Sequence, residues 1–312
     1  MRFVSYRQDG DAGWGVLNGD GVIDRRRLGD DLPASLNAFI ARCGEQAGLL
    51  AAVARQAAGQ SATPLADVDL LPCVPQPGKI ICLGVNYLDH AKEGGNTVAD
   101  YPTLFLRCST SLLAHGAPLR VPTISSQLDF EAELALVIGR RTRFVSEDDA
   151  LDAVFGYACF NDATLRDYQR RTTQWTIGKN FDATGGFGPC LVTADELPPG
   201  CTGLHIESRL NGRVMQSANT TDMVFGVART VSLLSECLTL EPGDVIVMGT
   251  PAGVGYARKP PVWMRAGDSV EIEIEGLGVL RNPVLATDPQ SPALLAGADA
   301  NRANPADPAD PA

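Results

Sequence analysis

The architecture of this 312-residue chain is indicated most clearly by the stretch Asp129-Phe130-Glu131-Ala132-Glu133-Leu134-Ala135-Leu136-Val137-Ile138. The short apolar run after Glu133 is typical of a β-strand. Successive strand side chains point to opposite faces, so Glu131 and Glu133 share one face, with their Cα atoms about 7 Å apart. Two carboxylates at that spacing can bind a divalent ion, although an ordinary solvent-facing strand has the same pattern.

Many other segments are predicted to be short strands. Their connections are rich in glycine and proline, and few helices are expected, one of them over Tyr87 to Glu93. This pattern favours a β-rich α+β domain over a doubly wound α/β sheet. The predicted strands cover residues 79–83, 104–106, 133–138, 204–210, 244–248 and 269–275.

The two ends of the chain differ from this central region. Near the N-terminus, Asp9-Gly10 and Asn18-Gly19 between apolar runs predict hairpins, and residues 35–60 have apolar positions near helical spacing. The proline-rich segment 63–78 predicts a linker. We therefore expect a small N-terminal α+β domain over residues 1–72, a larger domain over 73–286 and a disordered Ala/Asp/Pro tail over 287–312.

Composition excludes several classes of protein. The chain is 45% hydrophobic and 20% charged, which excludes a wholly disordered protein. The formal net charge is −11 and no strong basic patch occurs, so no nucleic-acid partner is expected. There is no run of roughly 20 apolar residues and no signal peptide, so we expect a cytoplasmic protein without a membrane span. The eight scattered cysteines predict reduced thiols rather than disulfides or a zinc site.

A third carboxylate, Asp162, follows an apolar stretch where a strand end would place it near Glu131 and Glu133. Three carboxylates without histidine or thiolate form a hard, all-oxygen site. Such a site suits Mg²⁺ or Mn²⁺ better than zinc or copper.

Other residues have the chemistry of a catalytic site. In a helix, Glu93 would lie three residues after His90 on the same face, where a carboxylate can orient an imidazole as a general base; a surface His–Glu pair has the same spacing. Lys179, between glycine and a turn-like segment, can stabilise a developing negative charge, although most lysines simply face solvent. The loop 249–255 either brings backbone amides and the Thr250 hydroxyl to a small anion or simply forms a turn. His115 and His205 are expected to be structural.

Taken together, these segments resemble the fumarylacetoacetate hydrolase family. The resemblance extends over about two thirds of the chain, roughly residues 78–284. It rests on many motifs that occur in the family's order rather than on any single motif. The shorter N-terminal region looks like the small first domain common in bacterial members. The matching segments are Gly84-Val85-Asn86-Tyr87 with His90 and Glu93, Asp129 to Leu134, Asn161-Asp162 with Arg166-Asp167 and Gln169, Gly178 to Asp182, Gly188-Pro189, Asn211-Gly212, Pro242 to Ile246, Gly249 to Gly255 and Gly267-Asp268.

The resemblance implies a mixed β-sandwich roll as the catalytic domain, usually in a homodimer. It also implies roles for nine residues and a small anionic oxo-acid as substrate. The stretch 170–175 offers further contacts to an anionic substrate, without individual roles. The implied roles are Glu131, Glu133 and Asp162 as ligands of Mg²⁺ or Mn²⁺, His90 and Glu93 as the pair that activates water, Lys179 beside the reacting carbonyl, and Arg166, Gln169 and Thr250 as contacts to the carboxylate and oxo groups.

The leading hypothesis is a metal-dependent hydrolase that cleaves a carbon–carbon bond in a 2,4-dioxo acid of the acylpyruvate or fumarylpyruvate type, as in aromatic catabolism. A second hypothesis is an isomerase or decarboxylase, acting on an oxo-dienedioate such as 2-hydroxyhepta-2,4-diene-1,7-dioate or on oxaloacetate, which uses the same metal but no attacking water. A third, from another class, is a non-catalytic metal- or acid-binding protein. This last reading predicts the loss of the base or the lysine, and the chain has both His90 and Lys179.

Overall fold

The computed structural model describes residues 1–95 and 100–287. At the N-terminus, strands β1 (Arg2–Gln8), β2 (Asp11–Asn18) and β3 (Gly21–Asp24) form an antiparallel meander. The turn between β1 and β2 contains Asp9 and Gly10, whose φ angles are 53° and 92°. Two positive φ angles are what a two-residue hairpin turn requires. The predicted hairpins at this end of the chain are therefore confirmed.

The helix predicted over residues 35–60 is two helices instead of one. α1 spans Leu36–Glu45 and α2 spans Leu49–Ala57. Between them Gln46 is extended and Gly48 has a φ of 83°. Glycine reaches a positive φ without the steric cost that other residues incur, so the helical path is interrupted at this point.

The segment 63–78, predicted as a linker, also contributes two short strands. β4 (Thr63–Pro64) pairs with β3, and β5 (Asp69–Leu70) pairs with β1. Pro64 is tolerated because β4 lies at the edge of the sheet, where a missing backbone N–H breaks no ladder. The linker prediction is therefore wrong for these residues.

The main sheet continues through seven strands: β6 (Ile80–Gly84), β7 (Thr103–Arg107), β8 (Leu112–Leu113), β11 (Ala132–Ile138), β12 (Val154–Asp162), β14 (Gly185–Thr193) and β17 (Val245–Val247). Its order is β4-β3-β2-β1-β14-β12-β11-β17-β6-β7, with β5 beside β1 and β8 beside β14. The N-terminal strands join this sheet because β1 pairs with β14, where Phe3 lies opposite Leu191. The division into domains at residue 72 stays a prediction.

A second sheet lies against the main one. It contains β9 (Leu119–Val121), β15 (His205–Leu210), β16 (Arg213–Asn219), β18 (Ser269–Ile274) and β19 (Gly278–Ala286), in the order β16-β15-β18-β19-β9. Leu134 and Leu136 of β11 belong to one buried cluster with Ile206 of β15 and Ile272 of β18. The hydrophobic core between two packed sheets confirms the predicted β-rich α+β fold class.

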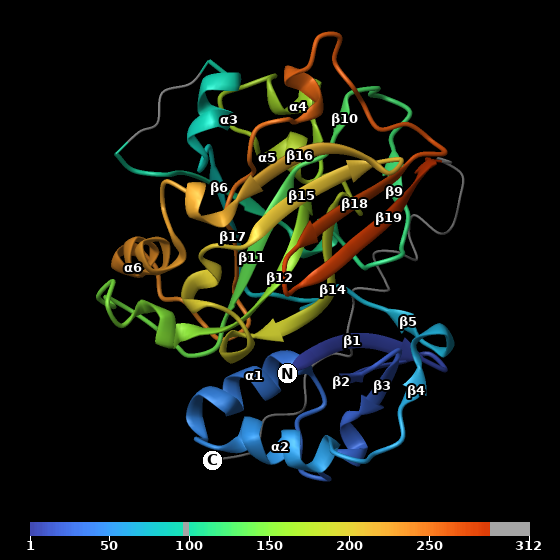
Figure 1. The fold of residues 1–312 in the computed structure, drawn as a ribbon, viewed down its shortest axis with the longest axis vertical. Coiled ribbons are helices and arrows are strands. Elements are labelled where there is room, and N and C mark those ends of the chain that lie inside the picture. Colours follow the sequence, from blue (N-terminus) through green and yellow to red (C-terminus); the bar gives the residue numbers. More distant parts are fainter. Residues whose placement is uncertain (96–99, 288–312) are drawn as a thin grey trace.

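Four helices and two short strands complete the central region: α3 (Leu88–Glu93), α4 (Arg166–Gln169), α5 (Thr176–Lys179), α6 (Val227–Cys237), β10 (Leu128–Asp129) and β13 (Thr164–Leu165). α3, α4 and α5 gather at the end of the molecule opposite the N-terminal strands (Figure 1). In the described residues no helix has the length and apolarity to cross a bilayer. Each of the eight cysteines is free. Apart from Thr287, the tail predicted as disordered lies outside the described residues.

Candidate metal and substrate site

Pairing between β11 and β12 brings the three predicted carboxylates together. Glu133 lies opposite Phe160, so the start of β11 meets the end of β12, and the Asp162 amide donates to the Glu131 carbonyl at 3.0 Å. Glu131, Glu133 and Asp162 are at most 3% exposed. One carboxylate oxygen from each lies within 4.8 Å of the others. The solvent-facing interpretation of this strand is therefore wrong, because its acidic face is buried.

Cationic side chains neutralise two of these three carboxylates. Lys179 Nζ lies 2.6 Å from Glu131 Oε2 and 2.5 Å from Asp162 Oδ2. Arg107 forms a second ion pair with Asp162, and both side chains are fully buried. Arg166 Nη2 lies 2.5 Å from Glu131 Oε1. Glu131 and Asp162 thus each have two cationic partners.

Glu133 differs from the other two carboxylates. Within residues 1–95 and 100–287 it has no ion pair with a lysine or arginine, and its Oε2 accepts a hydrogen bond from the Gly249 amide at 2.6 Å. Burial raises the pKa of Glu133 well above its usual range, and the nearby carboxylates of Asp162 and Glu131 raise it further. A divalent cation between the three oxygens would supply the missing charge. The all-oxygen donor set fits Mg²⁺ or Mn²⁺.

Asp129 anchors the arginine beside this cluster, a role the sequence did not suggest. Its Oδ2 accepts from Arg166 Nε at 2.8 Å and from the Tyr256 amide at 3.0 Å, while its Oδ1 accepts from the Gly255 amide at 2.7 Å. Arg166 Nη1 donates to Gln169 at 3.0 Å, and Nη2 donates to Glu131. All three guanidinium nitrogens of Arg166 therefore have protein partners. Through them the side chain links Asp129, Gln169 and Glu131 and fixes their relative positions.

The substitution Asp129→Asn is expected to lower the free energy of unfolding by about 3–5 kcal/mol, because it removes one of the two carboxylates that pair with the buried Arg166 guanidinium. Urea denaturation measures this difference. The control is Asp89→Asn, whose side chain is 79% exposed in a surface pair with Lys92 and should cost less than about 1 kcal/mol. Equal stability of the two variants would contradict the anchoring role.

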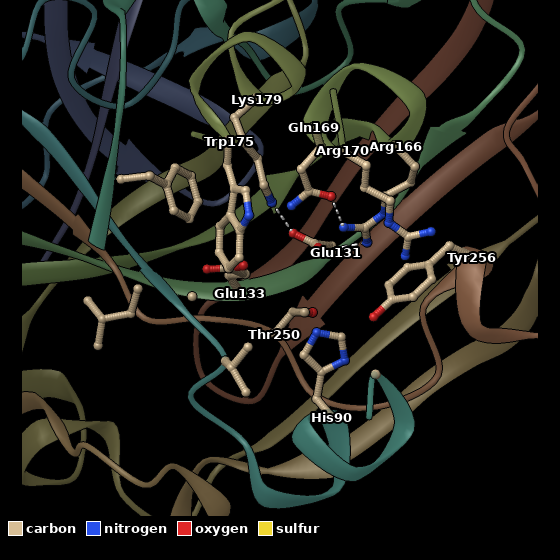
Figure 2. A pocket seen from close by; sticks show the side chains of 15 residues that line it. His90, Glu131, Glu133, Arg166, Gln169, Arg170, Trp175, Lys179, Thr250 and Tyr256 are labelled. Carbon is tan, nitrogen blue, oxygen red and sulfur yellow. Dashed lines mark hydrogen bonds and ion pairs between the residues drawn. The ribbon is translucent and has the colours of Figure 1, made fainter. Parts of the chain in front are cut away.

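His90 and Glu93 meet on one face of α3, as their spacing predicts. His90 Nδ1 lies 3.3 Å from Glu93 Oε2. The helix begins after Asn86, which is buried and fixed by donating to the Phe225 and Met248 carbonyls at 3.0 and 2.7 Å. The His90 ring points into the pocket between Thr250 and Tyr256 (Figure 2). This arrangement leaves the second ring nitrogen for a proton transfer.

The loop 249–255 does not present its amides to a free anion in this structure. The amides of Gly249, Gly253 and Gly255 donate to the carboxylates of Glu133, Glu93 and Asp129, respectively. Gly253 has a φ of 105°, and a Cβ at that position would lie 2.3 Å from the Met215 carbonyl oxygen, so only glycine fits. The small-anion interpretation is corrected: the anions at these amides are the side chains of the site itself.

The same loop places Thr250 on the pocket wall. Its hydroxyl donates to the Ala132 carbonyl at 2.9 Å and accepts from Gln216 Nε2 at 2.7 Å. The hydroxyl thus holds the loop against β11 as well as lining the pocket.

Close packing of α4 and α5 brings Gln169 and Lys179 to the same wall. A Cβ on Gly178 would lie 2.4 Å from the Gln169 amide nitrogen, so the residue before Lys179 has to be glycine. Gln169 uses its Oε1 to accept from Arg166, which leaves its amide N–H groups for another partner.

These side chains enclose a cavity of about 360 Å³. Seven of the nine predicted site residues line it, whereas Asp162 lies beneath the surface and Glu93 lies behind His90. Figure 2 shows Lys179 and Trp175 on one side of Glu131, and Arg166, Arg170 and Tyr256 on the other. Tyr256 was not foreseen, and Arg170 and Trp175 fall within the stretch to which the sequence assigned no individual roles.

Comparison with known proteins matches most of the chain to one family. Residues 79–285 match the family model described as fumarylacetoacetate (FAA) hydrolase C-terminal. The mitochondrial oxaloacetate tautomerase fahd2 of Xenopus laevis is 38% identical over 291 residues, which cover 91% of this chain and 90% of that protein.

Two solved structures are similar over 92% of this chain and 100% of their own. The fumarylacetoacetate hydrolase of Exiguobacterium antarcticum has a TM-score of 0.76 and 35% identity. The maleylpyruvate hydrolase of Sphingobium sp. SYK-6, solved with manganese(II) and pyruvate, has a TM-score of 0.76 and 31% identity.

Proposed function

Since the chain belongs to the fumarylacetoacetate hydrolase family, we propose that it is a metal-dependent enzyme that interconverts the keto and enol forms of a small 2-oxo dicarboxylic acid of the oxaloacetate type. The observation that carries this proposal is one pocket, lined by Glu131, Glu133, Lys179 and His90, in which the two glutamates cluster with the buried Asp162 and the histidine is held by a glutamate. The identity of 38% to an oxaloacetate tautomerase over nine tenths of both chains supports this reaction over the hydrolysis that the sequence alone favoured.

Glu131, Glu133 and Asp162 would hold Mg²⁺ or Mn²⁺, which supplies a Lewis acid for the oxo and carboxylate oxygens of the substrate. His90, held at Nδ1 by Glu93, takes a proton from the carbon next to the oxo group with its second nitrogen. The C–H electron pair becomes the C=C bond, and the oxo oxygen gains the negative charge and then the proton. A Lys179 N–H that is not used by Glu131 or Asp162 stabilises that charge, and the Gln169 amide orients the substrate carboxylate.

A second candidate is the hydrolysis of a 2,4-dioxo acid such as an acylpyruvate or fumarylpyruvate. The same His90–Glu93 pair would take a proton from water, which would then attack the distal carbonyl. The similarity to a maleylpyruvate hydrolase supports this alternative. Isomerisation of an oxo-dienedioate and decarboxylation of oxaloacetate use the same site without an attacking water. The homodimer implied by the family resemblance stays a prediction.

The test is an absorbance assay of enol-oxaloacetate decay, with acetylpyruvate, fumarylpyruvate and a dienedioate assayed in parallel by mass spectrometry. We expect a faster approach to the keto–enol equilibrium without pyruvate formation. EDTA should lower the rate by about 10²–10³-fold, since a metal Lewis acid supplies several kcal/mol, and Mg²⁺ or Mn²⁺ should restore it. Pyruvate plus a second acid would establish the hydrolase, and CO₂ release would establish the decarboxylase. A rate that EDTA leaves unchanged would overturn the metal-dependent mechanism.

A further inference from the structure

We infer that Arg170 selects substrates with a second carboxylate, by pairing with the carboxylate group remote from the oxo group. This inference rests on the proposed function, because it names the residue that gives that site its preference for dicarboxylic acids. It assigns an individual role within the stretch 170–175.

The first support is that Arg170 has no acidic partner in the described part of the chain. The other cations of the site are engaged: Arg166 by Asp129 and Glu131, and Lys179 by Glu131 and Asp162. Arg170 is exposed and lines the cavity, and its side-chain contact is the ring of Tyr256, 4.5 Å from the guanidinium carbon to the ring centroid. Its guanidinium N–H groups are therefore free to bind a ligand.

The second support is that Arg170 is held in a defined place. The Tyr256 amide donates to the buried Asp129 at 3.0 Å, which fixes this residue beside the pocket. The Arg166 guanidinium carbon also lies over the Tyr256 ring, 4.4 Å from its centroid. Stacking on an aromatic ring leaves the planar edge of a guanidinium available for a carboxylate. Because the contact with the Tyr256 ring restricts this side chain, binding costs less conformational entropy than for an unrestrained arginine.

The third support is the position of Arg170 relative to the carboxylate cluster. Lys179 and Trp175 lie on one side of Glu131, whereas Arg170 and Tyr256 lie on the other (Figure 2). A substrate whose oxo-acid end binds at the cluster and Lys179 therefore extends its far end toward Arg170. The cavity of about 360 Å³ accommodates a small dicarboxylic acid.

The neighbouring Arg171 provides a matched control. It is exposed, it stacks on Tyr168 at 3.7 Å, and it is not among the residues that line the cavity. Arg170→Met and Arg171→Met remove the same charge one residue apart, so they share any effect of net charge on anion binding. A difference in ligand affinity between the two variants therefore measures the local contact between Arg170 and the ligand. Arg170→Lys keeps the charge but loses the planar fork.

The experiment measures binding to the Mn²⁺-loaded protein by calorimetry, with two probes. Oxalate resembles the oxo-acid end alone, and 3,3-difluorooxaloacetate adds the remote carboxylate but cannot enolise. Arg170→Met should weaken difluorooxaloacetate binding by about 10- to 100-fold, the range for a charge-assisted pair. Oxalate binding to that variant, and binding of both probes to Arg171→Met, should change by less than about twofold. Arg170→Lys should fall between wild type and Arg170→Met.

Equal weakening of both probes by Arg170→Met, or no weakening of either, would overturn the inference. The inference would also be overturned if the wild-type protein bound difluorooxaloacetate no more tightly than oxalate. The result does not depend on keto–enol turnover, because neither probe can enolise. A protein that shows the selective loss at Arg170 but does not accelerate enol-oxaloacetate conversion would refute the proposed function and leave the assignment of Arg170 standing.

Discussion

Glu133→Gln is expected to lower the affinity for Mn²⁺ by at least about 100-fold, because even the outer partners of metal ligands typically contribute 10- to 100-fold. Glu133 is the carboxylate of the cluster that forms no ion pair with a described lysine or arginine, so a bound cation would supply the charge that stabilises its ionised form. Turnover should fall with the affinity at limiting metal. Calorimetry and the enol-decay assay measure the two effects.

The pH dependence of Mn²⁺ binding gives a second readout of the same substitution. The raised pKa of Glu133 means that the metal-free protein keeps a proton on this group to a higher pH than an exposed glutamate does. A bound cation displaces that proton, so the affinity should fall by about tenfold per pH unit below the pKa of Glu133 in the folded protein. The heat of binding should also vary with the ionisation enthalpy of the buffer, and Glu133→Gln should abolish this variation. The control is Glu236→Gln on the exposed surface of α6. An unchanged affinity in Glu133→Gln would refute the metal site.

His90→Gln is expected to lower kcat by about 10²–10⁴-fold, the usual contribution of a positioned general base. The metal affinity and the affinity for oxalate should stay within about twofold, since His90 contacts none of the three carboxylates by a hydrogen bond or ion pair in the described structure. This pattern separates loss of chemistry from loss of the site.

The matched control for His90→Gln is His205→Gln, whose imidazole is exposed and bonds to Ser217 at 3.0 Å. It should retain full turnover. The assignment of His90 as the base fails if His90→Gln turns over as fast as this control. A loss of Mn²⁺ affinity equal to the loss of kcat would instead make His90 part of the metal site.

Local patterns in the sequence predicted the parts of the site that lie close together in the chain. The two-residue strand period placed Glu133 of β11 and Glu131, just before β11 begins, on a common face, and helical spacing placed His90 beside Glu93. Asp129 lies on the separate strand β10, so the alternation of β11 does not extend to the residue that anchors Arg166. Periodicity within an element decides which side chains share a face, and it needs no knowledge of the rest of the fold.

Contacts between distant segments could not be predicted in the same way. Arg107 meets Asp162 across 55 residues, and Tyr256 meets Asp129 across 127. No local pattern marks either pairing, because each depends on strand order in the main sheet and on the path of one loop. The prediction of one helix over residues 35–60 was wrong for a different reason. The apolar spacing continues through Gly48, where the backbone adopts a positive φ and the helical path is interrupted.

The loop 249–255 has one further consequence. Its three glycine amides donate hydrogen bonds to Glu133, Glu93 and Asp129. These carboxylates are, in the same order, a candidate metal ligand, the partner of His90 and the anchor of Arg166. A displaced loop therefore disturbs cation binding, proton transfer and substrate orientation at once. We therefore expect a substitution that displaces this loop to weaken all three functions together, rather than any one of them alone.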